Sequence, residues 1–126
     1  MGQKEAFIWS KFLEDKGSNY FNFFYNFRLR RPLNLPRDFP DNLKSMALHG
    51  TSFRIDAYSE DKSNIYIFEV RPSATHSAIG TLIMYKFLFH LQENPSKNVV
   101  MCLVTDTFDA SIEFTCRQVG ILYFVY

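Results

Sequence analysis

Residues 65–71, with the sequence IYIFEVR, restrict the fold of this chain more than any other segment. β-Branched and aromatic residues dominate this run, which is typical of a strand. Pro72 ends it, because proline has no N–H to donate to a sheet. The residues before it, SEDKSN at 59–64, are all polar and indicate a turn. With residues 46–58 as the preceding strand, the pattern predicts an antiparallel hairpin.

Hydrophobic periodicity predicts further helices and strands on both sides of this hairpin. Three prolines also indicate an extended loop over residues 32–42. Helices between later strands imply parallel crossovers, so the sheet is expected to be mixed and flanked by helices. The order α-β-β-β-α-β-α-β over residues 1–126 predicts one α/β domain. Besides the hairpin, the predicted elements are helix 3–16, strand 20–31, helix 75–92, strand 98–104, a short helix over about 108–117 capped by Thr105, Asp106 or Thr107, and strand 121–126.

Charge and composition limit the expected partners. The net charge is only +1, so nucleic-acid binding requires a local basic patch. Four arginines after the aromatic run around Phe21–Phe27 supply such a patch. Three of them, Arg28, Arg30 and Arg31, would contact backbone phosphates or, alternatively, protect an edge strand. The aromatic run itself is a candidate surface for a homodimer or another partner. The four residues are Arg28, Arg30, Arg31 and Arg37.

Other features predict an intracellular, cytoplasmic protein without a membrane partner. The first residues carry charges and no continuous apolar stretch, and no run of 18 apolar residues occurs in the chain. The two cysteines lack metal-type spacing, and Cys102 is expected to be a buried thiol. A Gly-rich phosphate loop is also absent from the sequence, which argues against a nucleotide hydrolase.

Two carboxylates of the hairpin are the candidate catalytic centre. If the hairpin folds about residues 61–62, Asp56 lies opposite Glu69, with the Cβ atoms roughly 5 Å apart. Such a pair repels unless a divalent cation lies between its members, and carboxylate oxygens suit Mg²⁺ or Mn²⁺. Arg71 shares one strand face with Glu69, because side chains alternate along a strand. The same residues could instead be a strand-end aspartate and an exposed Glu69–Arg71 ion pair.

These segments resemble motifs of the PD-(D/E)xK nuclease superfamily. Gly50, Arg54-Ile55-Asp56-Ala57 and Ile67-Phe68-Glu69-Val70-Arg71 are similar to its motifs II and III, with Arg71 in place of the usual lysine. The helix AIGTLIMY at 78–85 resembles the Q-x-x-x-Y motif of the RecB/Cas4 type, with Thr81 in place of the glutamine. The closing segments from VTD to VGILYFVY also resemble the end of that core. The resemblance implies a restriction-endonuclease-like three-layer fold.

The resemblance also implies roles for individual residues. Asp56, Glu69 and the Val70 carbonyl would bind the metal, together with Glu5, for which Glu14 or a merely solvated helix charge are alternatives. Arg71 would stand in the catalytic position, where it can hold a phosphate but cannot serve as a base. Tyr85 would contact nucleic acid or be a core aromatic residue. The expected nucleic-acid contacts are Arg28, Arg30, Arg31, Arg54 and Tyr85.

The expected function is therefore a metal-dependent nuclease or DNA-processing protein, of the RecB/Cas4 or Holliday-junction-resolvase type. A site with Mg²⁺ or Mn²⁺ would hydrolyse phosphodiester bonds of single-stranded, duplex or branched DNA, for instance in repair or recombination. Arg71 and Thr81 favour an alternative, a nuclease-fold domain that binds nucleic acid or protein without cutting. A third possibility is an interaction domain in which Asp56 and Glu69 never meet.

Overall fold

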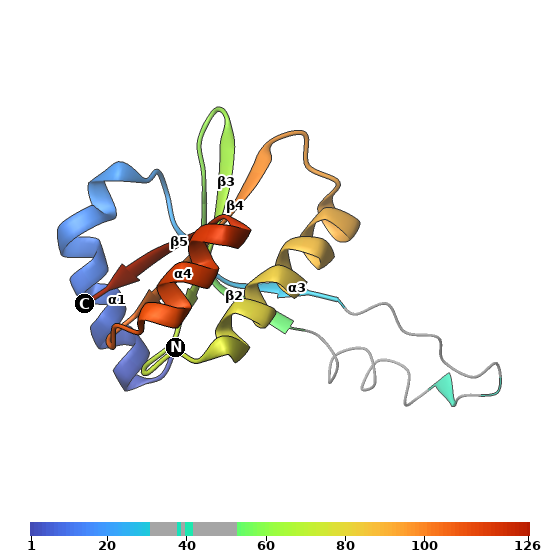
Figure 1. The fold of residues 1–126 in the computed structure, drawn as a ribbon. Helices are drawn as coiled ribbons and strands as arrows, with labels where there is room; N and C mark the ends of the chain where they lie inside the picture. Colours follow the sequence, from blue (N-terminus) through green and yellow to red (C-terminus); the bar gives the residue numbers. More distant parts are fainter. Residues whose placement is uncertain (31–37, 39, 42–52) are drawn as a thin grey trace.

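The computed structural model describes residues 1–30, 38, 40, 41 and 53–126. In these residues the chain is an α/β protein with a five-stranded mixed sheet and three α-helices (Figure 1). The predicted loop 32–42, except 38, 40 and 41, and residues 46–52 of the predicted strand lie outside the described residues. The elements in chain order are α1 (Gln3–Lys16), the 3₁₀ turn η1 (Gly17–Asn19), β1 (Phe24–Leu29), β2 (Phe53–Glu60), β3 (Asn64–Val70), α3 (His76–Glu93), β4 (Asn98–Thr105), α4 (Ala110–Val119) and β5 (Ile121–Val125).

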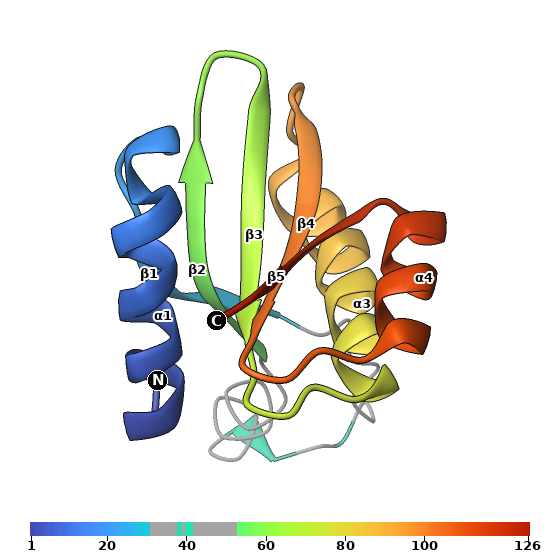
Figure 2. The same ribbon diagram turned by 60° about the vertical axis from the view of Figure 1, so that its left-hand side comes forward.

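The strands lie in the sheet in the order in which they occur in the chain, β1-β2-β3-β4-β5. β1, β2 and β3 pair antiparallel, whereas β3, β4 and β5 pair parallel. The parallel strands are joined by α3 and α4, which both lie on one face, while α1 covers the other (Figure 2). The predicted mixed sheet flanked by helices is confirmed. The carboxyl ends of β3, β4 and β5 consequently meet at one edge of the molecule.

Each face of the sheet has its own hydrophobic core. Under α3 and α4, the largest cluster joins aliphatic strand residues such as Ile67 and Leu103 to Leu82 and Phe89 of α3. The smaller cluster under α1 is aromatic, and Phe12 is fully buried at its centre. The Phe12 ring lies 5.0 Å from that of Trp9 and 5.4 Å from that of Phe68, between ring centroids. Much of the aromatic excess of the sequence therefore serves this second core.

The alternation of side chains reverses at one step shared by β1 and β2. On β2, Ile55 belongs to the core under α3 and Ala57 to the core under α1, although they are two residues apart. On β1, Tyr25 reaches α1, with its hydroxyl 3.1 Å from the Trp9 Nε1, whereas Phe27 packs on the opposite side. Asn26 and Asp56 stand at the step that the register of the two strands skips, and Asn26 has a φ of 55°, in the left-handed region that asparagine tolerates. A local irregularity of the sheet thus coincides with Asp56.

Two local predictions need correction. The turn of the hairpin is shorter than SEDKSN: Ser59 and Glu60 still belong to β2, and Asp61 closes the turn by accepting the N–H groups of Ser63 and Asn64 at 2.9 and 2.7 Å. Helix α4 starts later than predicted, because Asp109 is its N-cap and accepts from the Ser111 and Ile112 amides. The predicted caps at 105–107 were wrong, since the Asp106 carboxylate is turned toward the Ser73 N–H instead.

Neither cysteine is bonded to another sulfur, and both side chains are buried in the cores. Burial raises the pKa of the Cys102 thiol. Among the described residues, no helix combines the length and hydrophobicity that crossing a membrane requires.

Replacing Phe12 by alanine is expected to destabilise the protein by about 3–5 kcal/mol, because it empties the centre of the aromatic core. The free energy of unfolding in urea measures this loss. Phe7, on the same helix but 62% exposed, provides the matched control: Phe7→Ala should change stability by less than about 0.5 kcal/mol. Equal losses in the two variants would contradict the assignment of this core.

Candidate functional site

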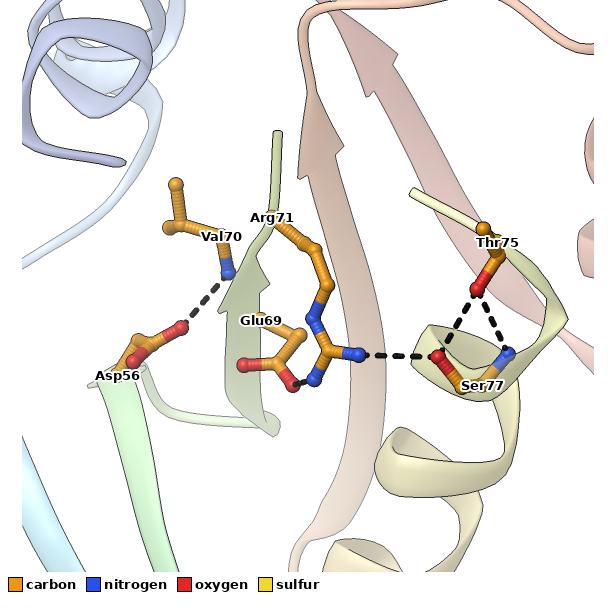
Figure 3. A network of polar contacts seen from close by, with 6 residues as sticks. All are labelled: Asp56, Glu69, Val70, Arg71, Thr75 and Ser77. Carbon is orange, nitrogen blue, oxygen red and sulfur yellow. Dashed lines mark hydrogen bonds and ion pairs between the residues drawn. The ribbon is translucent and has the colours of Figure 1, made fainter. Parts of the chain in front are cut away.

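The site forms where the backbone pairing of β2 with β3 ends. The ladder runs from Glu60–Ile65 to Ala57–Phe68, and its next step sets Asp56 across from Glu69. At this step the Asp56 side chain replaces a backbone acceptor: the Val70 N–H donates to Asp56 Oδ2 at 2.8 Å (Figure 3). The carboxylate therefore lies between the two strands, tied to the backbone next to Glu69.

Glu69 is a buried acid, only 4% exposed. Burial raises its pKa to about 8, and the Asp56 carboxyl adds to the shift by hydrogen bonding with it and by repelling its charge. Arg71 opposes these effects with its positive charge and a hydrogen bond. The two carboxyl groups thus meet, which contradicts the interpretation of an acidic pair that never comes together.

Arg71 connects the acidic pair to the start of α3. Its Nη2 lies 2.6 Å from Glu69 Oε2, and its Nη1 donates to the Ser77 hydroxyl at 3.1 Å (Figure 3). Ser77 in turn lies 2.9 Å, between hydroxyl oxygens, from Thr75, the N-cap of the helix. The predicted ion pair exists, but its acid is buried rather than exposed. Since the Arg71 side chain is 34% exposed, the guanidinium remains accessible from solvent.

The backbone around Arg71 is held at several points. Its N–H donates to the Val104 carbonyl at 2.9 Å, which extends the parallel pairing of β3 with β4 beyond Val70. The turn that follows is fixed by side chains at the end of β4: Asp106 accepts the Ser73 N–H at 2.7 Å, and the Thr105 hydroxyl accepts the Ala74 N–H at 3.1 Å. These bonds fix the orientation of Arg71 relative to the sheet.

Tyr85 supports the site from the core. Its side chain is 8% exposed and packs against Phe53, with 5.9 Å between ring centroids. Burial raises the pKa of its hydroxyl to about 12, and the charges of Glu69 and Asp56 contribute to the shift. The hydroxyl therefore stays neutral close to the acidic pair. The structure places Tyr85 with the core aromatic residues rather than on a contact surface.

Asp56 is open on the side that faces α1. There it lines a cavity of ≈ 290 Å³ together with Trp9, Tyr25 and Asn26. Glu69, by contrast, points toward the side of α3, where it meets Arg71. A ligand would therefore reach the Asp56 carboxylate from the α1 side.

The remaining predicted metal ligands are arranged less favourably. Val70 supplies its N–H to Asp56. Glu5 lies in the first turn of α1, where its carboxylate reaches back to Gly2: a Cβ at that glycine would lie 2.6 Å from Glu5 Oε2. In the described part of the chain, no three His, Cys, Asp or Glu side chains gather to hold a metal ion. Glu5 is therefore not brought together with Asp56 and Glu69.

Two of the predicted nucleic-acid residues are neighbours. Arg28 on β1 pairs with Arg54 on β2, and both side chains are exposed. Arg30 is also exposed, and its N–H donates to the Gln92 side chain of α3 at 3.0 Å. Arg31 and Arg37 lie outside the described residues. A basic pair at the ends of β1 and β2 thus lies two residues from Asp56.

Sequence reasoning missed Thr75, Ser77 and Asn26. A threonine at the start of the predicted helix 75–92 is a common N-cap residue, so the role of Thr75 could have been predicted. The contact of Ser77 with Arg71 carried no such signal, because it depends on how α3 sits against β3. Asn26 interrupts an aromatic run and tolerates positive φ, but its place opposite Asp56 required the strand register.

Comparison of the chain with protein-family models, curated proteins and solved structures found no match. The functional assignment therefore depends on the geometry of the site.

Glu69→Gln is expected to change how stability depends on pH. A folded-state pKa of about 8, against 4.5 for the ordinary group, means that the native state retains a proton that the unfolded chain has lost. Stability from this group is therefore present at low pH and is lost as pH rises from about 4.5 to 8. Denaturant unfolding from pH 5 to 9 should show a shallower decline for the variant, with a gain of at least about 1 kcal/mol at pH 9.

The control is Glu113→Gln, at an exposed i,i+4 pair with Arg117 on α4. This change should leave the pH dependence as in the unmodified protein, since a surface pair contributes little. Parallel curves for Glu69→Gln and the unmodified protein would show that the Glu69 pKa is not raised.

Proposed function

We propose that the protein is a metal-dependent nuclease or DNA-processing protein that hydrolyses phosphodiester bonds. The observation that carries this proposal is the buried Glu69 with Asp56 and the Arg71 guanidinium beside it, where the backbone pairing of β2 with β3 ends. Two adjacent acids and a cation are the minimum that a phosphodiester site requires: oxygens for a divalent ion and a positive partner for the phosphate.

The acidic pair fits Mg²⁺ or Mn²⁺ chemically. Burial and mutual repulsion disfavour two negative charges here, as the raised pKa of Glu69 shows, and a divalent cation would offset both effects. Asp56 and Glu69 would supply the protein oxygens, which suit these hard cations. When bound, such a cation supplies Lewis acidity toward the phosphate and lowers the pKa of a bound water.

Arg71 would bind the phosphate rather than move a proton. An arginine stays protonated at any ordinary pH, so it cannot act as the general base. Its guanidinium is held by Ser77 through Nη1 and by Glu69 through Nη2. If Glu69 turns its oxygens to a cation, Nη2 becomes available to a phosphate oxygen while Ser77 keeps the group oriented.

The topology supports a relationship to the PD-(D/E)xK superfamily and its restriction-endonuclease-like fold. A mixed sheet between α1 and the α3–α4 pair, with the acids on two adjacent antiparallel strands, is the arrangement that the sequence resemblance implies. DNA is the substrate that this relationship favours. The exposed Arg28–Arg54 pair near Asp56 is suited to contact its backbone.

A second candidate function is binding of nucleic acid or protein without cleavage. The observation in its favour is the closed chain of contacts from Glu69 through Arg71 to Ser77, which already pairs the buried acid with a cation. A site satisfied in this way is stable without a metal ion. Metal binding and cleavage separate the two functions.

Asp56→Ala is expected to reduce Mn²⁺-dependent cleavage at least about 100-fold, because it removes one of the two acids that would bind the cation. Labelled single-stranded, duplex and branched DNA, resolved on denaturing gels, provide the measurement. The control is Asp61→Asn, at the turn on the far end of the same two strands, which should keep its activity (Figure 1). If the unmodified protein leaves all three substrates intact with Mn²⁺, the binding-only function replaces the nuclease.

Cation binding at pH 7 is expected to release protons, because Glu69 is largely protonated below its raised pKa and must ionise to bind a metal. Calorimetric titration with Mn²⁺ in two buffers of different ionisation enthalpy measures the number released. About one proton should leave, and Glu69→Gln should release none. Binding without proton release in the unmodified protein would place the cation elsewhere.

A further inference from the structure

A cavity of ≈ 540 Å³ lies beside the proposed site, at the carboxyl ends of the parallel strands. One wall is α1, which contributes Lys4, Phe7 and Lys11. The opposite wall comes from Ser73, in the turn after β3, and Tyr126, directly after β5. In sheets with parallel strands, this edge is where ligands characteristically bind. None of these residues was among the nucleic-acid contacts expected from the sequence.

The cavity has a positive balance of charge. Lys4 and Lys11 lie seven residues apart on one face of α1, roughly 10 Å along the helix axis. The Asp106 carboxylate also lines the cavity, where its Oδ1 accepts the Ser73 N–H and the Thr107 hydroxyl at 2.7 and 3.0 Å. These bonds, with a smaller contribution from the charge of Lys4, lower the pKa of Asp106, so the carboxylate stays negatively charged. Two lysines against one carboxylate leave an excess of positive charge, which favours an anionic ligand.

The same cavity offers aromatic surface. Phe7 is 62% exposed, so its side chain is part of neither hydrophobic core. The Lys11 Nζ lies 4.5 Å from the Phe7 ring centroid, so it covers one face of the ring and leaves the other for a further contact. Across the cavity, the Tyr126 ring is oriented by a 2.6 Å hydrogen bond from its hydroxyl to Asp15.

We propose that the Lys4–Lys11 cavity binds a nucleotide unit of a single-stranded nucleic acid next to the phosphate held by Arg71. The lysines would contact backbone phosphate, and the base would lie against the free face of Phe7. This combination of cations with exposed rings is how proteins bind single strands without sequence preference. The inference rests on the proposed function, since it names the substrate that would extend from the Arg71 position.

The chain connects the two positions rigidly. Only Pro72 separates Arg71 from Ser73 of the cavity wall, and the intervening turn is held by Asp106 and Thr105. The Arg71 side chain turns to the α3 side and the cavity lies against α1, so a strand that contacts both would cross the edge of the sheet at Pro72 and Ser73. An acidic peptide would satisfy the lysines as well, but it would leave the exposed Phe7 ring beside Lys11 without a contact, so nucleic acid is the favoured occupant.

The test is fluorescence anisotropy of a labelled oligothymidylate in EDTA and low salt, where cleavage does not occur. The double variant Lys4→Ala/Lys11→Ala should bind at least about tenfold more weakly, and the slope of log Kd against log salt should fall by about 1.4, the value for two phosphate contacts on a single strand. Phe7→Ala should weaken binding about tenfold with an unchanged salt slope, and Phe7→Trp should restore it. The matched control Lys62→Ala/Lys86→Ala removes the same charge on other surfaces and should bind as the unmodified protein does. Thermal melts monitored by circular dichroism verify that every variant is folded.

Several outcomes would overturn the proposal. Equal losses of affinity in the two double-lysine variants would mean that only net charge matters. Unchanged affinity in Phe7→Ala would show that the base does not contact Phe7. If the unmodified protein ignores oligothymidylate but binds polyglutamate through Lys4 and Lys11, the cavity serves an acidic protein segment. If the unmodified protein shows no Mn²⁺-dependent cleavage but Lys4, Lys11 and Phe7 still determine oligonucleotide binding, the nuclease proposal fails and this inference stands. If the protein cleaves DNA and the cavity variants bind the oligonucleotide normally, this inference alone is refuted.

Discussion

The hydrogen bond from the Val70 N–H to the Asp56 carboxylate is the interaction on which the site depends. It joins β2 to β3 after their backbone pairing has stopped. A buried Val70 N–H without an acceptor would be costly in free energy, so its hydrogen bond holds the Asp56 carboxylate in place. That constraint puts a second carboxyl group next to Glu69, where it adds to the rise of the Glu69 pKa that burial causes, and the Arg71 guanidinium opposes this rise.

The irregular step at Asn26 explains how the sheet accommodates this arrangement. A regular ladder would direct Asp56 to one face and leave both neighbours on the other. Because the alternation reverses at this step in both strands, Ile55 and Ala57 fill different cores while the carboxylate stays between the strands. The left-handed φ of Asn26 is the local strain that accompanies this arrangement. The site is thus built into the sheet and does not rest on a loop.

The sequence predicted features that depend on periodicity and missed those that depend on tertiary placement. Helix 3–16 coincides with α1, and the strands near 65–71 and 98–104 lie within a residue of β3 and β4, since their hydrophobic patterns are long and regular. The strand predicted over 20–31 is longer than the observed β1. Tyr20 and Phe23 pack on the aromatic core, and Asn22, with a φ of 31°, interrupts the strand conformation. Asp56 and Glu69 could be paired by counting across the hairpin. The burial of Glu69 and the contact of Ser77 with Arg71 could not be predicted from the sequence, because both depend on how α3 covers the sheet.

The aromatic core also links distant parts of the chain. The Phe12 ring on α1 lies 5.2 Å from that of Phe124 on β5, and the Tyr126 hydroxyl bonds Asp15. These contacts span more than a hundred positions, so α1 has only part of its binding surface until β5 has left the ribosome. Trp9 and Phe12 can pack on Phe68 as soon as β3 has formed, whereas the contacts of Phe12 with Phe124 can form only after β5 has been synthesised.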